Sequence, residues 1–277
     1  MSWKIKFISV AAFAALFFNS TAAAPGDDTA NLKFGRECKR LKAETVRRIE
    51  LPKGYHEGLS IGGGGTVWVV NGRALKIWIV DIASGKVLGD IEPVGTFTEA
   101  VTAASGGKFF VSDWDQKKIY GARLEANTLK AESEFSVAPA HPAGILWKDP
   151  RLYVITWTRG FGTKFHLLEM DRDGKILAKT LLRGIQEPAH LAFDGKNIWI
   201  TSWYSRRVYR VNLKEHRITG YFPTPFGRAT GITWDGEFLW VTGTDADLYQ
   251  MKVHPVREPN GSLTVGADEQ FSNGVKG

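Results

Sequence analysis

The sequence predicts an all-β fold, a five-bladed β-propeller, and three repeated features lead to this prediction. The first is a short strand that carries a large aromatic residue among β-branched ones, as half-buried strands do. It occurs five times, at steps of 42, 43, 46 and 41 residues, and its aromatic residues are Trp68, Phe110, Tyr153, Trp199 and Trp240. A period of about 40 to 45 residues is typical of a propeller blade with four short strands.

The second and third features place the other strands of each blade. A further strand follows each aromatic strand after ten to thirteen residues, and turn residues such as Ser84-Gly85 and Asp173-Gly174 then lead to another strand. In front of each aromatic strand lies a segment of small and apolar residues. We assign it to the innermost strand, because small residues suit the crowded axis of the ring. The five segments are residues 55–59, 97–101, 141–145, 187–191 and 228–232.

The two ends of the repeat region predict how the ring closes. Residues 41–50 contain a strand-like piece that could complete the last blade and so join the two termini. The polar tail beyond Pro255 could supply another edge strand. We therefore expect one propeller domain over residues 45–255, a basic and solvated lead-in over residues 25–44 and a polar tail over residues 256–277.

The first 24 residues are typical of a secretory signal. Lys4 and Lys6 form a basic start, an apolar run follows over residues 7–18, and the small residues at 22–24 offer a cleavage site. The apolar run is too short to span a hydrocarbon core of about 30 Å as a helix. The alternative is an uncleaved anchor. We expect a secreted or periplasmic protein with no membrane segment after cleavage.

Composition narrows the function classes. Without Lys4 and Lys6 the formal net charge falls from +7 to +5, and no Lys/Arg block suggests a nucleic-acid partner. A single cysteine, Cys38, excludes an internal disulfide and a cysteine-based metal cluster, and we expect it to be a partly buried residue. The sequence shows no sign of a redox enzyme. We expect a monomer that uses no cofactor.

The innermost segments resemble those of the plant and bacterial type of glutaminyl cyclase, a family of five-bladed propellers. Residues 55–59 (Tyr-His-Glu-Gly-Leu) match the opening of the family's first blade, and residues 97–101 (Phe-Thr-Glu-Ala-Val) match that of its second. Trp114 and Trp203 match its tryptophans in the second and fourth blades, and residues 231–243 resemble its last blade. The resemblance covers about residues 45–253.

The sequence also departs from this family at several binding positions. Ala143 replaces a tryptophan of the third blade, and residues 188–191 (Pro-Ala-His-Leu) replace an Asn-Glu-Leu-Glu segment of the fourth. Thr244 replaces a lysine of the last blade. Loop residues such as Arg159, Arg206 or Arg228 could take over their roles. The pattern fits either a different substrate or a propeller without the activity.

The resemblance implies an aminoacyltransferase that converts an N-terminal glutamine into pyroglutamate and releases ammonia. One positioned carboxylic acid can take the proton from the attacking amine and deliver one to the leaving nitrogen. Glu99 is the catalytic candidate, because an apolar aromatic pocket would raise its pKa. The substrate-binding candidates are Tyr55, Glu57, Phe97, Trp114 and Trp203. No metal is required, and the substrate would be a small peptide with N-terminal glutamine.

Structural roles without any part in catalysis or binding remain open for these residues. Glu99 could cap the backbone of a neighbouring blade or pair with an arginine. Trp114, Trp157 and Trp203 fall at matching places in consecutive blades and could line a cavity or pack between blades. His141 and His190 could face the central channel and hold a metal with the glutamates, but two histidines about 50 residues apart have no recognised ligand spacing.

Three functions are compatible with the sequence. The first is the glutaminyl cyclase-like enzyme. The second is a non-catalytic exported propeller whose aromatic funnel binds a peptide or a protein partner. The third is a metal-dependent lactonase-like hydrolase, suggested by glutamate and histidine residues on the inner strands.

Overall fold

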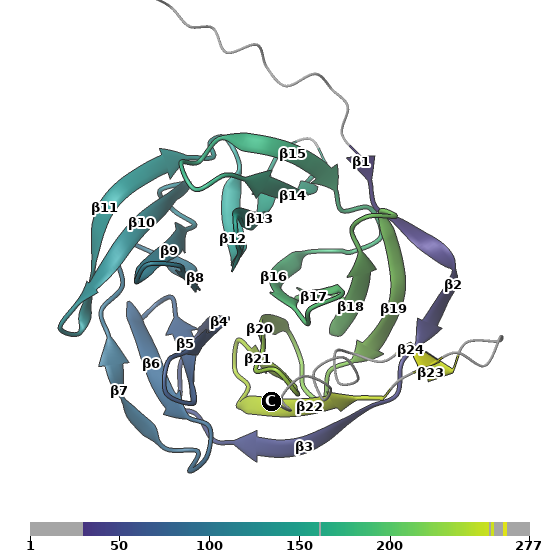
Figure 1. Cartoon of the computed structure of the whole chain (residues 1–277), viewed down its shortest axis with the longest axis horizontal. Coiled ribbons are helices and arrows are strands. Elements are labelled where there is room, and N and C mark those ends of the chain that lie inside the picture. Colours follow the sequence, from purple (N-terminus) through teal and green to yellow (C-terminus); the bar gives the residue numbers. More distant parts are fainter. Residues whose placement is uncertain (1–29, 161, 255, 258–262, 265–277) are drawn as a thin grey trace, which may run out of the picture.

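A computed structural model describes residues 30–160, 162–254, 256–257 and 263–264. It confirms the all-β, five-bladed propeller, with five sheets arranged around a central axis (Figure 1). No helix of the described residues is long and apolar enough to cross a membrane. Residues 1–24, which we predict to be a secretory signal, lie outside the described residues.

Each blade is a sheet of four antiparallel strands whose first strand lies nearest the axis. The strands of the first two blades are β4 (His56–Gly62), β5 (Thr66–Asn71), β6 (Lys76–Asp81), β7 (Val87–Ile91), β8 (Thr98–Ala104), β9 (Lys108–Asp113), β10 (Lys118–Glu125) and β11 (Thr128–Ser136). Those of the third and fourth are β12 (His141–Lys148), β13 (Arg151–Thr158), β14 (Lys164–Met170), β15 (Ile176–Leu181), β16 (Pro188–Phe193), β17 (Ile198–Ser202), β18 (Arg207–Asn212) and β19 (Arg217–Pro223).

The last blade combines both ends of the chain. It consists of β20 (Ala229–Trp234), β21 (Leu239–Gly243), β22 (Leu248–Val253) and, as its outer strand, β3 (Ala43–Ile49). The pairing of β3 with β22 is antiparallel, with Ile49 opposite Leu248. The prediction that residues 41–50 complete the last blade is confirmed.

The segment before β3 is more ordered than the solvated lead-in that we expected. β1 (Ala30–Asn31) and β2 (Lys33–Arg40) pair in parallel with the outer strands β15 and β19. Those outer strands have free edges, and the lead-in covers them. Two apolar residues anchor this segment, Leu32 and Leu41, which are 0% and 3% exposed. We expected a solvated segment because most of the neighbouring side chains are charged. Cys38 lies half-buried on β2, close to our expectation.

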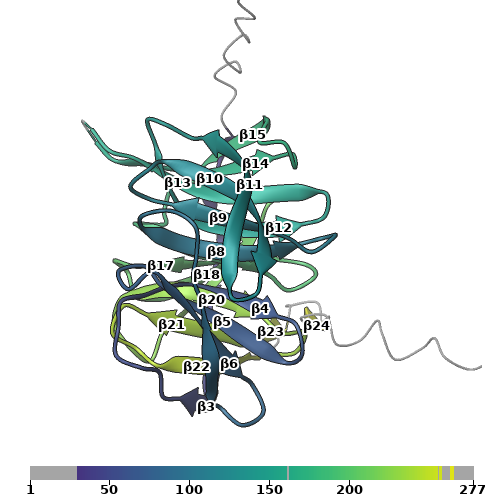
Figure 2. The same cartoon turned by 90° about the vertical axis from the view of Figure 1, so that its left-hand side faces the viewer.

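The C-terminal strands do not extend a blade. β23 (Val256–Arg257) and β24 (Leu263–Thr264) pair only with each other among the described strands, and Figure 2 shows them projecting from one face of the ring. The described part of the tail, residues 256–257 and 263–264, therefore does not add the edge strand that we considered.

The hydrophobic core is divided into five clusters, each between two neighbouring blades. The five repeated aromatic residues all belong to these clusters, and the most exposed of them, Tyr153, is 8% exposed. The fully buried Trp240, for example, packs in the cluster that joins the last blade to the first. Because no blade has a core of its own, the ring is stable only as a whole.

Glycine is needed where inner strands of neighbouring blades touch. A Cβ atom on Gly144 of β12 would lie 2.5 Å from the Cα atom of His190 on β16. A Cβ atom on Gly231 of β20 would lie 2.4 Å from the carbonyl oxygen of Glu57 on β4. Both distances are below the contact limit, so these blades could not approach so closely with any larger residue.

Candidate active site

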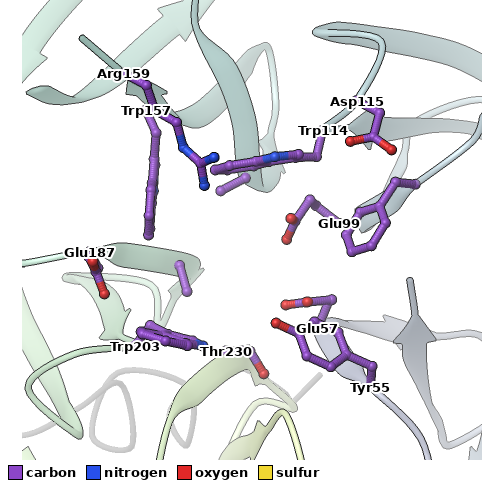
Figure 3. Close-up of a pocket in the computed structure, with 13 residues that line it drawn as sticks. Tyr55, Glu57, Glu99, Trp114, Asp115, Trp157, Arg159, Glu187, Trp203 and Thr230 are labelled. Atoms are coloured by element: carbon purple, nitrogen blue, oxygen red, sulfur yellow. The ribbon is translucent and has the colours of Figure 1, made fainter. Parts of the chain in front are cut away.

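A cavity of about 350 Å³ lies at one end of the ring axis and draws residues from all five blades. It is formed by the starts of the inner strands and by the connections that follow the second strands. Figure 3 shows its lining, which consists of Tyr55, Glu57, Phe97, Glu99, Trp114, Asp115, Ala143, Trp157, Arg159, Glu187, Ala189, Trp203 and Thr230. The structure thus brings together all six residues that the sequence proposed for the site.

A repeated irregularity of the inner strands creates the floor of this cavity. In every inner strand the pairing register shifts next to the cavity, and the skipped residues have no partner on the second strand. Such bulges turn a side chain away from the plane of the sheet. The skipped residues that line the cavity are Glu57, Glu99, Ala143, Ala189 and Thr230.

Two of these floor residues form a carboxyl pair. The side chains of Glu57 and Glu99 are hydrogen-bonded to each other and point toward one another in Figure 3. Glu57 is 6% exposed, whereas Glu99 is half-buried and faces the cavity. Since ionised carboxylates are acceptors only, this hydrogen bond requires a proton on one of the two groups.

The surroundings raise the pKa of both carboxyl groups of this pair. Burial, followed by the negative charges of Asp115 and Asp113, raises the pKa of Glu99 to about 8, while the hydrogen bond from Glu57 and the charge of Arg159 act to lower it. Burial and the neighbouring Glu99 raise the pKa of Glu57 well above its usual range. A carboxylic acid whose pKa is near 8 can exchange protons with an amine at neutral pH.

A buried aspartate fixes the backbone in front of Glu99. Asp113, at the end of β9, is 0% exposed, and its Oδ2 atom accepts hydrogen bonds from the amides of Thr96 at 2.5 Å and Phe97 at 3.3 Å. Its Oδ1 atom accepts one from the amide of Gln116 at 2.9 Å. The sequence alone indicates no more than a loop carboxylate at Asp113. Its role depends on a turn that the sequence does not reveal.

Aromatic rings and Arg159 form the walls, and Arg228, which is not a lining residue, stacks on one of the rings. The rings of Trp114 and Trp157 meet edge to face, with centroids 5.4 Å apart. The guanidinium group of Arg159 lies over Trp114 at 5.0 Å, and that of Arg228 lies over Trp203 at 4.4 Å. The structure supports both interpretations that the sequence left open for the three tryptophans. All three line the cavity, and Trp114 and Trp157 also pack against the hydrophobic cluster between the third and fourth blades. Trp157 also donates a hydrogen bond from Nε1 to the carbonyl oxygen of Pro188, at 2.7 Å.

His141 and His190, the two histidines that the sequence offered as metal ligands, lie outside the cavity lining. His141 stacks on Trp114 with centroids 4.6 Å apart, and its Nδ1 atom is 2.9 Å from the carbonyl oxygen of Trp114. His190 is 2% exposed, and its Nδ1 atom is 3.0 Å from the carbonyl oxygen of Ile232. The described part of the chain contains no group of three or more His, Cys, Asp or Glu side chains arranged to hold a metal ion.

Glu187 is a lining residue that sequence reasoning did not single out. It directly precedes β16, in the same place as Tyr55 before β4 and Phe97 before β8. In each of these blades the carbonyl oxygen of this residue accepts a hydrogen bond from the residue after the second strand. This equivalence with two proposed binding residues is the signal that could have identified it.

Fold and site together define a five-bladed β-propeller with a carboxyl pair in an aromatic cavity at one end of its axis. Neither a protein-family model nor a curated protein matches the sequence. Among solved structures the chain is similar to the glutaminyl cyclase of Myxococcus xanthus, with a TM-score of 0.63 and 16% identity, over 78% of this chain and 98% of that one.

Other propellers are similar to a lesser degree. The PQQ-bound aldose sugar dehydrogenase of Streptomyces coelicolor gives a TM-score of 0.54 at 13% identity, over 77% of this chain and 98% of that one. A chain of a nidogen/laminin complex gives 0.53 at 16% identity, over 74% of this chain and 87% of that one. At such identities these similarities show the fold alone, so the chemistry must be argued from the cavity.

Proposed function

We propose that the protein is a glutaminyl cyclase-like aminoacyltransferase that forms N-terminal pyroglutamate and releases ammonia. The observation that carries this proposal is the hydrogen-bonded pair of Glu57 and Glu99 at the floor of an aromatic cavity. The cavity volume of about 350 Å³ falls in the range of small-ligand sites. It is large enough for a terminal glutaminyl residue and the start of the peptide that follows.

The reaction needs one group that handles protons. The α-amine of the substrate attacks the side-chain amide carbon, a carbon–nitrogen bond forms, and the amide nitrogen leaves as ammonia. Protonated Glu99 donates its proton to the leaving amide nitrogen and takes up the proton that the attacking amine loses, so it ends the cycle as it began. Glu57 holds the carboxyl group of Glu99 in place through their hydrogen bond.

The aromatic walls contribute through position. Folding the glutaminyl side chain back toward its own amine costs conformational entropy, and a narrow cavity reduces this cost by binding the folded form. The rings of Trp114, Trp157 and Trp203 also displace water from the reacting carbon. Cyclisation is thereby favoured over hydrolysis of the side-chain amide.

The direct test is release of ammonia from a peptide such as Gln-Ala-Phe amide. We expect release of one ammonia per peptide, together with a product that no longer has a free amine. The matched control is the N-acetylated peptide, which has the same side chain but no nucleophile and should release none. Ammonia from both peptides would indicate a glutaminase, and ammonia from neither would contradict the proposal.

A second outcome of that test has structural support. Three positions depart from the resembling family, and the floor residues Ala143 and Ala189 and the substituted Thr244 offer no charged group. Peptide binding without turnover would therefore identify a binding propeller that has kept the cavity and lost the activity. Secretion, predicted from residues 1–24, would give either protein access to exported peptides.

The pH dependence of turnover should follow the charges around Glu99. Free Glu99 must be protonated when it meets an unprotonated amine, so kcat/KM should fall on the alkaline side as pH rises through about 8. Asp115→Asn removes a negative charge, lowers the pKa of Glu99 and should move this alkaline limb to lower pH. Arg159→Met removes a positive charge, raises that pKa and should move the limb to higher pH. The check is a kcat/KM profile for each variant, and shifts in the same direction would contradict Glu99 as the titrating group.

A further inference from the structure

The carboxyl group of Glu187 has an oxygen atom that lacks a partner. Its Oε2 atom is buried and forms no hydrogen bond with any described residue, although the side chain lines the cavity. The ion pairs of the described residues do not include Glu187 either. An unsatisfied buried acceptor destabilises the folded protein, and the same carboxyl group belongs to a side chain of the cavity lining, where a ligand cation can approach it.

The backbone holds this group in place at a cost. Glu187 has a φ angle of +47°, which side chains other than glycine seldom adopt, and it precedes Pro188. Its carbonyl oxygen accepts a hydrogen bond from the amide of Trp203 at 2.9 Å, and the carbonyl oxygen of Gln186 accepts one from the hydroxyl of Ser202. The backbone that carries the carboxyl group is therefore fixed before any ligand arrives.

The surroundings of Glu187 suit a cation. The indole rings of Trp157 and Trp203 line the same cavity, and hydrogen bonds tie both residues to the backbone at positions 187 and 188. A carboxylate beside indole faces attracts an ammonium or guanidinium group by charge and by cation–π interaction. Arg159 lies over Trp114 and Arg228 lies over Trp203, so of these two rings Trp157 is the one that no arginine or lysine of the described residues covers.

Figure 3 shows Glu187 across the cavity from Glu57 and Glu99, with tryptophan rings between the two sides. A terminal glutamine whose amine reaches Glu99 would direct its next residue toward the opposite wall. We propose that Glu187 binds the basic side chain of the residue that follows the N-terminal glutamine, so that peptides beginning Gln-Lys or Gln-Arg are preferred. This inference rests on the proposed cyclase function.

The test compares two peptides that differ by one charge. Gln-Lys-Ala amide and Gln-norleucine-Ala amide share an aliphatic stem, and only the first ends it in an ammonium group. We expect the ratio of their kcat/KM values to be about ten or more in favour of lysine, as for a hydrogen bond to a charged partner, and to fall to about one in Glu187→Gln. The matched control is Glu215→Gln, which removes the same charge from an exposed residue of the same blade outside the cavity lining and should keep the ratio.

Calorimetric binding of both peptides separates this inference from the proposed function. Tighter binding of the lysine peptide that is lost in Glu187→Gln, without any turnover, would support the cation site and contradict the cyclase. Turnover of both peptides at equal kcat/KM would support the cyclase and overturn the cation site. Binding of neither peptide would overturn both.

Discussion

Glu99→Gln is expected to lower the rate of ammonia release from glutaminyl peptides by about a thousandfold. The substitution keeps the size of the side chain and removes the group that carries protons between the two nitrogen atoms, and such groups contribute roughly 10²–10⁴ to a rate. Peptide affinity should change much less, because the aromatic walls are untouched. The measurement is single-turnover ammonia release at saturating peptide, and a variant with the original rate would exclude Glu99 as the proton carrier.

The same variant should be at least as stable as the original protein. The pKa of Glu99 is raised in the folded state, so its contribution favours folding most at low pH and is lost as pH rises from the ordinary value of about 4.3 through about 8. A glutamine does not ionise, so the gain from Glu99→Gln should be larger at pH 9 than at pH 5. Thermal unfolding at both values checks this. An inactive variant that is less stable at both would point to misfolding instead.

Ile49→Asp is expected to open the ring by weakening its closing strand. Ile49 on β3 is 4% exposed and packs in the cluster between the last blade and the first. The substitution removes buried apolar surface and introduces a charge without a partner. We expect a loss of about 4 kcal/mol in the free energy of unfolding, or about 10 °C in the midpoint of thermal unfolding.

The control for this prediction lies on the same strand. Val46 is 50% exposed, so Val46→Asp makes the same kind of change on the solvent face of β3 and should cost less than about 1 kcal/mol. Equal destabilisation by the two variants would mean that β3 responds to charge or strand propensity, not to burial between the blades.

The blades could be predicted from the sequence because they rest on short-range patterns. An aromatic residue such as Trp199 recurs with the period of the blade, and the space that it fills between two blades is the same in every repeat. The proposed site residues, such as Phe97 and Trp114, came instead from the resemblance of these segments to one family. A resemblance to one family then selected Glu99 among the acidic residues.

The features of the fold and the site that could not be predicted from the sequence depend on pairing between distant segments. The bulges that turn Glu57 and Glu99 into the cavity follow from register, and the same inner strand without a shift would place these side chains differently. The parallel strands β1 and β2 follow from free edges elsewhere in the chain. That the Oε2 atom of Glu187 lacks a hydrogen-bond partner can be seen only when the positions of its neighbours are known.

The pairing of β3 also determines when the ring can close. This strand lies near the start of the chain but pairs with β22, about 200 residues later, so this contact has one of the longest sequence separations in the fold. Loop-closure entropy makes such contacts late events in folding. During synthesis the ring stays incomplete until residue 253 has left the ribosome. Since Thr230 of the last blade and Glu57 of the first line one cavity, a nascent chain without the last blade cannot form that cavity.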